Sequence, residues 1–492
     1  MYYKFLTMAN FNFKRWNLIL GWVAFGVAFL TYALTVEPTV GFWDTGEYIL
    51  TSSKLEVGHP PGAPLFQMLG AFFSIFASEP AQIGLVLNMM SAAASAFTIL
   101  FMFWSIVLLL QKITTKESES NTNKQTAILG AAFVGSLSFA FTDSFWFNAV
   151  ETEVYAMATL IMAVMFYLGL RWEKEMNTPR GNRWLILISF IVGLSFGVHF
   201  MGLLTIPAIG LLYYFKNYKT ITPKNFILAN IVVVAVLLFI FKLLAPNILR
   251  YFSALEIFFV NSVGLPYNSG SIIALILLVL FIYLGLNYSK KKGHVILNTS
   301  LLCITFIIIG FTTWLMLPIR ANANVPVNEN NPSSARELLA YYNLEQYPKT
   351  HLFYGPQFTD QYAGLDENQP YVDDKPKYEK DKKSGRYVVV NDYENAIQNY
   401  NSNHGSLLPR MWSGEHAENY MIYSGALEFS IKPEYSMQNE LRSLVNDFRK
   451  AITEGEVDFE GYHDFLKTYG RYLDIEKPSL IDNVYYLFDY QI

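Results

Sequence analysis

Charge and cysteine are both scarce in this chain of 492 residues. Charged residues make up 15% of the sequence, whereas soluble domains usually contain about 25%. The single cysteine, Cys303, excludes an intrachain disulfide and leaves the redox compartment open. The sequence also lacks the glycine-rich loops of Walker and dinucleotide-binding sites, and no feature favours nucleic acid as a partner. These absences argue against a soluble, nucleotide-dependent protein.

Apolar residues make up 52% of the chain and are grouped into long runs without charge. A helix needs about 20 apolar residues, with a range of roughly 17–25, to cross the hydrocarbon core. Runs near this length occupy 16–34, 83–110, 127–142, 154–170, 184–198, 200–215, 225–241, 271–287 and 295–317. We therefore predict an all-α polytopic membrane protein with a bundle of about nine transmembrane helices. The apolar stretch 64–76 is too short to span and is predicted to lie along the interface.

Basic residues fall on alternate connections between these runs. They gather before residue 16 and at 111–126, 171–183, 216–224 and 290–292. The positive-inside rule makes these connections cytoplasmic. The N-terminus is then cytoplasmic, and the intervening connections and everything after Leu317 face outward. This pattern predicts a multi-pass protein of the cytoplasmic membrane with a periplasmic C-terminal region.

Charge also divides the chain into two regions. Residues 318–492 carry a net charge of −10, and residues 1–317 carry +6. Different solvents for the two regions are the simplest explanation. We therefore predict a transmembrane module over 1–317 and an extracytoplasmic α/mixed region over 318–492. Within the latter, the charged stretch 366–386 is predicted to be a mobile loop.

The first outward connection contains two carboxylates, Asp44 and Glu47, three residues apart. A helical turn would place both on one face. Desolvation and like-charge repulsion there would raise their pKa values and suit one of them to act as a general base. The structural alternative is a solvated loop in which Asp44 caps a helix. The sequence indicates no definite cofactor, although Asp44 and Glu47 are the residues that would hold a divalent cation.

The second outward connection ends in Glu151 and Glu153, where a membrane helix begins. Carboxylates at that position interact favourably with the helix dipole, which would be a purely structural role. The functional interpretation is that they face Asp44 and orient a substrate or a cation. We include Trp43 and Tyr155 with these glutamates in a predicted donor or acceptor pocket.

Three further residues could bind a phosphate at the same membrane face: His59, His199 and Arg320. A lone histidine such as His199 is usually a hydrogen-bonded core residue, and an arginine at a helix end commonly snorkels to the interface. The predicted topology, however, places His199 on the outer face, at the same level as Asp44 and Glu151. Polar residues in such a position are functional candidates.

Acids that activate a hydroxyl and cations that hold a phosphate fit one reaction. In that reaction a hydroxyl attacks a sugar carried on a polyprenyl phosphate, and the charge that develops on the leaving phosphate is stabilised by His or Arg. The acceptor could be an exported protein or, alternatively, a lipid or surface glycan. A transporter or flippase is a third interpretation, but the predicted helices lack the mid-membrane acids and bases of a transport pathway.

Several motifs match a known family across nearly the whole chain. They are GFWDTGEY (41–48), GHPPG (58–62), WFNAVETEVY (146–155), GVH (197–199), LTIPA (204–208), RAN (320–322), PVNENNP (326–332), LFYGP (352–356) and PRMWS (409–413). The chain thereby resembles the membrane family known as domain of unknown function 2723, which is glycosyltransferase family 117 of the GT-C superfamily. Its members come mostly from Bacteroidota, and its animal relatives are protein O-mannosyltransferases.

The resemblance implies a GT-C membrane glycosyltransferase that transfers mannose from a polyprenyl-phosphate donor to Ser or Thr hydroxyls of exported proteins. By analogy Asp44 matches the first-loop acid that serves as the base. His199 falls where some of these enzymes place a lysine near the donor phosphate, and Glu47, Glu151 and Glu153 are motif residues without an assigned role. Family members continue beyond NVYYLFDYQI (483–492), so the resemblance predicts a C-terminal truncation.

Overall fold

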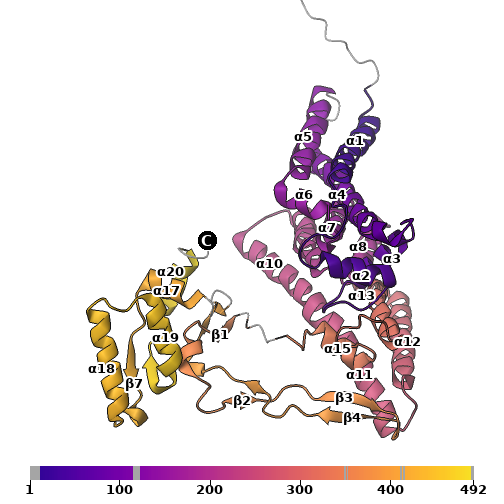
Figure 1. Ribbon diagram of the computed structural model, residues 1–492. Helices are drawn as coiled ribbons and strands as arrows, with labels where there is room; N and C mark the ends of the chain where they lie inside the picture. The colour runs from indigo at the N-terminus through magenta and orange to yellow at the C-terminus, as the bar shows by residue number, and fades with distance from the viewer. Residues whose placement is uncertain are drawn as a thin grey trace, which may run out of the picture. The chain divides into compact units, whose positions relative to one another are not determined.

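The protein folds into two compact units, residues 1–346 and 347–492. The computed structural model describes residues 11–114, 122–347, 351, 353–409, 413 and 416–488 (Figure 1). The motif residues Leu352, Arg410, Met411 and Trp412 and the last four residues of the chain lie outside this description.

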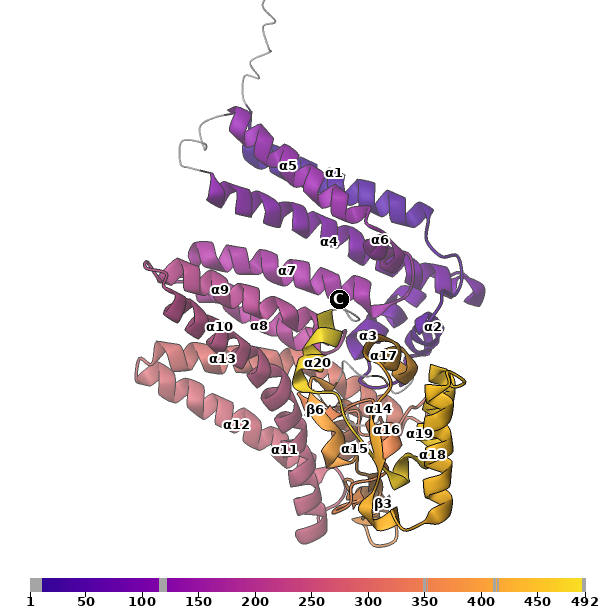
Figure 2. The same cartoon turned by 90° about the vertical axis from the view of Figure 1, so that its left-hand side faces the viewer.

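The first unit is helical. Its elements are α1 (Phe13–Leu34), α2 (Thr45–Lys54), α3 (Pro64–Ser74), η1 (Pro80–Gln82), α4 (Ile83–Ile113), α5 (Thr122–Ala140), α6 (Asp143–Ala149), α7 (Val154–Glu175), α8 (Asn182–Ser195), η3 (Phe200–Leu204), α9 (Thr205–Asn217), α10 (Pro223–Leu238), η4 (Phe239–Leu244), α11 (Ala245–Ile257), η5 (Phe258–Ser262), α12 (Ser269–Lys291), α13 (Val295–Phe311), η6 (Thr312–Leu315), α14 (Met316–Asn322) and α15 (Ala335–Tyr342). The long helices α1, α4, α5 and α7 lie side by side in Figure 2.

Among the described residues, six helices are long and apolar enough to cross a membrane. They are Phe13–Leu34, Pro80–Ile113, Val154–Glu175, Pro223–Ser262, Ser269–Lys291 and Val295–Asn322. A seventh span would be α5 with α6, which are bent by 69° at their junction. Each of the nine predicted runs does contain a helix, but α8 and α9 have only 14 and 13 residues. The prediction of an all-α polytopic membrane protein is confirmed.

One predicted connection, 242–270, is mostly helix instead. The charge-free run ends at Lys242, yet the helix continues through α11 to Ser262. The charges do not end it because Lys242 and Arg250 point to the exposed side. The opposite face of α11 buries Leu249 and packs against α12 and α15.

The predicted domain boundary at 317/318 lies too early. Helix α15 belongs to the first unit, because its Tyr341 and Tyr342 are buried in the same core cluster as Trp314. The ring centroids of Trp314 and Tyr342 are 5.2 Å apart. Residues 318–346 therefore complete the membrane unit, although their composition is that of a polar loop.

Helices α8 and α13 approach closely through two glycines. A Cβ on Gly193 would lie 2.2 Å from the carbonyl oxygen of Ile307, and one on Gly310 would lie 2.4 Å from that of Phe190. Small residues allow such contact between membrane helices. The α8 helix is thereby fixed beside α13, with the turn at His199 at its end.

We expect Gly193→Ala to destabilise the protein by about 1–3 kcal/mol, because a methyl group there must push two backbones apart. The measurement is thermal unfolding of the detergent-purified chain. Gly26→Ala on α1 is the matched control, since a Cβ there meets no atom within 4 Å. Equal stability of the two variants would contradict the close contact.

The second unit combines short strands with helices around an aromatic core. Its elements are β1 (Tyr354–Pro356), α16 (Asp360–Ala363), β2 (Tyr371–Val372), β3 (Lys377–Asp381), β4 (Arg386–Asn391), β5 (Ile397–Gln398), η7 (Ser402–His404), β6 (Gly405–Leu407), α17 (Ala417–Ser424), β7 (Phe429–Ile431), η10 (Pro433–Tyr435), α18 (Asn439–Thr453), α19 (Phe459–Tyr469), η11 (Gly470–Tyr472), β8 (Leu473–Ile475) and α20 (Leu480–Tyr486). The strands pair antiparallel as β1–β6, β2–β5, β3–β4 and β7–β8. Part of the stretch predicted as a loop, 366–386, therefore forms strands β2 and β3 and begins β4.

Candidate functional site

Asp44 immediately precedes helix α2 but does not cap it. Its side chain makes no capping hydrogen bond and is 60% exposed. The structural alternative from the sequence, a capping aspartate, is therefore not what the fold uses. Trp43 beside it has a positive φ of 58° and is 87% exposed. That backbone conformation is strained for a bulky residue, and such strain is often found at functional sites.

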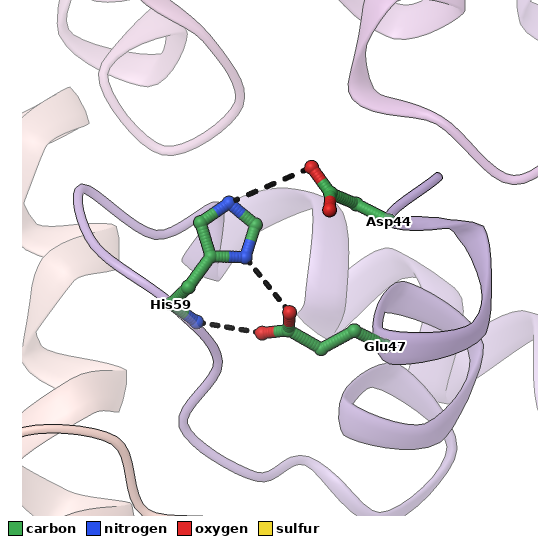
Figure 3. Close-up of side chains that lie close together, drawn as sticks. All are labelled: Asp44, Glu47 and His59. Carbon is green, nitrogen blue, oxygen red and sulfur yellow. Dashed lines mark hydrogen bonds and ion pairs between the residues drawn. The ribbon is translucent and has the colours of Figure 1, made fainter. Parts of the chain in front are cut away.

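Glu47 holds His59 in place (Figure 3). One oxygen of Glu47 accepts a hydrogen bond from the His59 backbone N–H at 2.6 Å, and the other lies 2.9 Å from ring Nδ1. The opposite nitrogen, Nε2, lies 3.9 Å from Asp44 Oδ2. His59 thus bridges the two carboxylates, with Nδ1 fixed by Glu47 and Nε2 directed at Asp44.

This arrangement favours a charged imidazolium. The hydrogen bond with Glu47 raises the pKa of His59; burial opposes the shift, and the negative charges of Glu47, Asp44 and Glu329 reinforce it. Burial raises the pKa of Glu47, but the hydrogen bonds and charge of His59 outweigh it and lower that pKa overall. A positive charge is therefore stabilised next to Asp44.

The GHPPG loop is shaped by its surroundings. The hydroxyl of Tyr341 on α15 donates to the carbonyl oxygen of Gly58 at 2.6 Å and also lies 3.1 Å from that of His59. A Cβ on Gly58 would lie 2.6 Å from Glu47 Oε1, and Gly62 has a positive φ of 73°. Gly58 is required because any side chain there would clash with Glu47, and Gly62 is required because its positive φ disfavours other residues.

Glu153 lies at the start of α7 and is 5% exposed. Its side chain makes no capping hydrogen bond. Burial, the charges of Asp44 and Glu151, and smaller opposing effects together raise the pKa of Glu153 to about 7. It can therefore gain or lose a proton near neutral pH.

Glu151 is equally buried, and burial together with the charge of Glu37 raises its pKa. It faces the loop before Asp44, because a Cβ on Gly41 would lie 2.7 Å from its Oε2. The intervening Thr152 donates to Asn88 Oδ1 at 2.5 Å and ties this turn to α4. Successive residues of the turn therefore point in different directions.

His199 immediately precedes the short helix η3, in the turn between α8 and α9. Its Nδ1 accepts a hydrogen bond from the Met201 backbone N–H at 3.1 Å. Because Nδ1 accepts, the ring proton resides on Nε2. Burial lowers the pKa of His199, so the neutral ring is favoured. The Tyr155 ring packs against it with centroids 5.3 Å apart.

A cavity of about 110 Å³ brings these groups together. It is lined by Asp44, Tyr48, His59, Pro61, Gly62, Glu153, Val154, Tyr155, Phe196, Val198, His199 and Phe200. Five sequence candidates, Asp44, His59, Glu153, Tyr155 and His199, thus share one cavity, although they come from well-separated parts of the chain. Glu47 lies behind His59, whereas Glu151, Trp43 and Arg320 are not among the lining residues.

Arg320 has other partners. Its Nε donates to the carbonyl oxygen of Leu55 at 2.5 Å and its NH2 group to that of Lys54 at 3.2 Å. Both carbonyls lie at the C-terminal end of α2, where a cation is favourable. The predicted grouping of Arg320 with the phosphate ligands is therefore not what the structure shows, and its guanidinium fixes α2 instead.

Asp44, Glu47 and His59 also form a group that could hold a metal ion, with one ligand atom from each within 4.8 Å of the others. Carboxylate and imidazole ligands suit several divalent ions. In the present arrangement, however, Nδ1 of His59 is hydrogen-bonded to Glu47. A cation bound at Nε2, the nitrogen directed at Asp44, would have to replace the proton that the imidazolium carries there.

Sequence reasoning missed two contributors. Tyr341 was not recognised because its partners Gly58 and His59 are more than 280 positions away along the chain. Tyr48 lines the cavity and packs its ring 5.8 Å from that of His59. The position of Tyr48, one residue after Glu47 in the recognised motif, was the signal that could have identified it.

Comparisons with known proteins agree with this division of the chain. Residues 44–222, which contain the cavity residues, match the family model described as the protein O-mannosyl-transferase TMEM260 N-terminal domain. This segment of the chain is therefore similar to the N-terminal domain of protein O-mannosyl-transferases of the TMEM260 type. Residues 348–488 match a family of unknown function, DUF8416, over nearly the whole second unit.

Two curated relatives match part of this chain. Protein O-mannosyl-transferase tmem260 of Dictyostelium discoideum is 25% identical over 190 residues, which is 36% of this chain and 21% of the relative. Protein O-mannosyl-transferase TMEM260 of Mus musculus is 25% identical over 167 residues, 33% of this chain and 21% of the relative. The matched segments thus span about a fifth of each relative's length. No solved structure matches the chain significantly.

Proposed function

We propose that this protein is a GT-C-type glycosyltransferase of the cytoplasmic membrane. It transfers a sugar, with mannose as the first candidate, from a polyprenyl-phosphate donor to Ser or Thr hydroxyls of exported proteins. The observation that carries the proposal is the cavity in which Asp44, Glu153, His59 and His199 meet. The match to a domain of protein O-mannosyl-transferases supports a protein acceptor.

Each side chain has a role that its geometry supports. The Asp44 side chain is exposed and makes no capping hydrogen bond to helix α2. Its carboxylate is therefore available to accept the proton of the attacking hydroxyl as general base. As the new glycosidic bond forms, the bond between the sugar and the phosphate oxygen breaks, and the electron pair leaves with the polyprenyl phosphate. The developing negative charge is stabilised by groups already in position.

Two histidines would hold that phosphate in different ways. His59 contributes positive charge, because its imidazolium form is favoured by Glu47. His199 contributes a hydrogen bond from Nε2–H, because its Nδ1 is already an acceptor. Glu153 lies on the acceptor side beside Asp44, and Glu47 positions His59. By the charge pattern of the connections, the cavity opens on the periplasmic side.

The direct test is transfer by the full chain reconstituted in lipid vesicles. Mannosyl polyprenyl phosphate and a Ser/Thr-containing peptide from an exported protein would be supplied, and glycopeptide would be detected by mass spectrometry. We expect product with this donor and none with a nucleotide sugar. Absence of product with several polyprenyl-linked sugars would overturn the proposal, and unchanged glycopeptides in a deletion strain would redirect it to a glycan acceptor.

A further inference from the structure

The cavity that contains Asp44 is too small for a whole lipid-linked donor. Its volume of about 110 Å³ corresponds to a few water molecules at roughly 30 Å³ each. Sites for small molecules usually measure roughly 300–1,000 Å³. A donor bound with its reacting carbon near Asp44 must therefore place its lipid in a neighbouring space.

A second hollow adjoins this cavity. It has a volume of about 380 Å³, and Tyr155 lines both spaces. Phe139 of α5 and Phe145 of α6 form one wall, with ring centroids 4.5 Å apart. Ala156 and Thr159 of α7 form the other wall.

The shape of the chain explains why this hollow exists. Helix α6 turns by 69° away from the direction of α5. Helix α5 packs against α1 and α4, so that α6 rather than α5 lies against α7 where α7 begins, next to Glu153. The hollow lies between two segments that belong to candidate membrane spans, so its side opening would face lipid rather than water.

We infer that the hollow between α5–α6 and the start of α7 binds the first isoprene units of the donor lipid. Tyr155 would lie between these isoprene units and the reacting phosphate. This inference rests on the proposed function and deepens it. Thr142, Ser144 and Asn148 also line the hollow, but the rings of Phe139 and Phe145 give it an apolar wall that favours a hydrocarbon chain. Continuity through Tyr155 sets the phosphate beside His199, whose ring contacts the same tyrosine. An acceptor peptide, the other candidate occupant, would leave its backbone polar groups unpaired along the Phe139 and Phe145 wall.

Position 159 gives the sharpest test. The Thr159 side chain is partly buried and donates a hydrogen bond to the carbonyl oxygen of Tyr155 within its own helix. Thr159→Ala slightly enlarges the hollow, whereas Thr159→Leu and Thr159→Phe progressively fill it. Ser138→Phe, on the exposed face of α5, adds the same ring outside the hollow and is the matched control.

Binding would be measured on the purified full chain with undecaprenyl phosphate and, separately, with inorganic phosphate. We expect Thr159→Phe to weaken binding of undecaprenyl phosphate at least about tenfold, since each buried methylene contributes roughly a factor of four in affinity. Thr159→Leu should have a smaller effect, and binding of inorganic phosphate should not change. The Ser138→Phe variant should behave as wild type.

The outcomes separate this inference from the proposed function. Unchanged undecaprenyl phosphate binding across the Thr159 series, or an equal loss of both probes in folded Thr159→Leu, overturns the inference. A raised KM for the acceptor peptide alone also overturns it and assigns the hollow to the peptide. The protein could also bind undecaprenyl phosphate more tightly than inorganic phosphate, lose that preference in the Thr159 variants, and yet transfer no sugar. That result would support the lipid site and overturn the proposed activity.

Discussion

Asp44→Asn is expected to lower sugar transfer by about 10²–10⁴-fold while leaving the fold intact. General-base catalysis contributes a factor of this size, and asparagine cannot accept the hydroxyl proton. The fold should persist because the Asp44 side chain makes no capping bond and is 60% exposed. The measurement is the rate of transfer at saturating donor and acceptor, alongside the unfolding temperature.

Glu47→Gln serves as the comparison, because Glu47 acts through His59. Loss of its charge should lower the pKa of His59 and raise the KM for the anionic donor more than it lowers kcat, since His59 would lose positive charge. Asp44→Asn should instead lower kcat with little change in KM. Wild-type turnover by Asp44→Asn would remove Asp44 from the role of base.

The meeting of Asp44, Glu153 and His199 could be predicted because membrane topology is a strong constraint. Once the basic connections are placed inside, each of these residues must lie at the outer ends of helices. That restricts all three residues to a thin layer at one surface of the membrane, and residues in one layer can share a cavity. The structure places all three in one cavity.

Partners separated widely in sequence could not be predicted in this way. Arg320 lies on the predicted face, but its hydrogen bonds to Leu55 and Lys54 depend on the packing of α14 against the end of α2. The same holds for Tyr341 and the GHPPG loop. Charge and hydropathy place a residue in a layer of the membrane, whereas side-chain packing decides which residue within that layer it contacts.

In the second unit, prediction from sequence failed for a different reason. Lysines and aspartates at 373–383 suggested a loop, yet β3 and β4 form a hairpin. The signal for a strand was present in Val388, Val389 and Val390, which are β-branched. Most residues of these strands are exposed or only partly buried, and charged side chains are therefore tolerated along them.

Glu153→Gln is expected to make the protein more stable above pH 7 and less active. The pKa of Glu153 is raised from about 4.5 to about 7, so the folded state holds this proton more tightly than the unfolded state does. Wild-type stability should therefore fall as the pH rises from about 4.5 to about 7, by roughly 3–4 kcal/mol on the scale of about 1.4 kcal/mol per pKa unit. Glutamine cannot ionise, so this part of the pH dependence should vanish.

The protonation state of Glu153 should also affect the affinity for the donor. An anionic phosphate beside Glu153 disfavours the carboxylate, so wild-type affinity for undecaprenyl phosphate should decrease as the pH rises through about 7. In Glu153→Gln this decrease should be absent, because no charge develops at position 153. Glu151→Gln is the control, since Glu151 is equally buried but does not line the cavity. A wild-type pH profile for both stability and donor affinity in Glu153→Gln would show that Glu153 stays ionised throughout, and would remove it from the proton balance of the site.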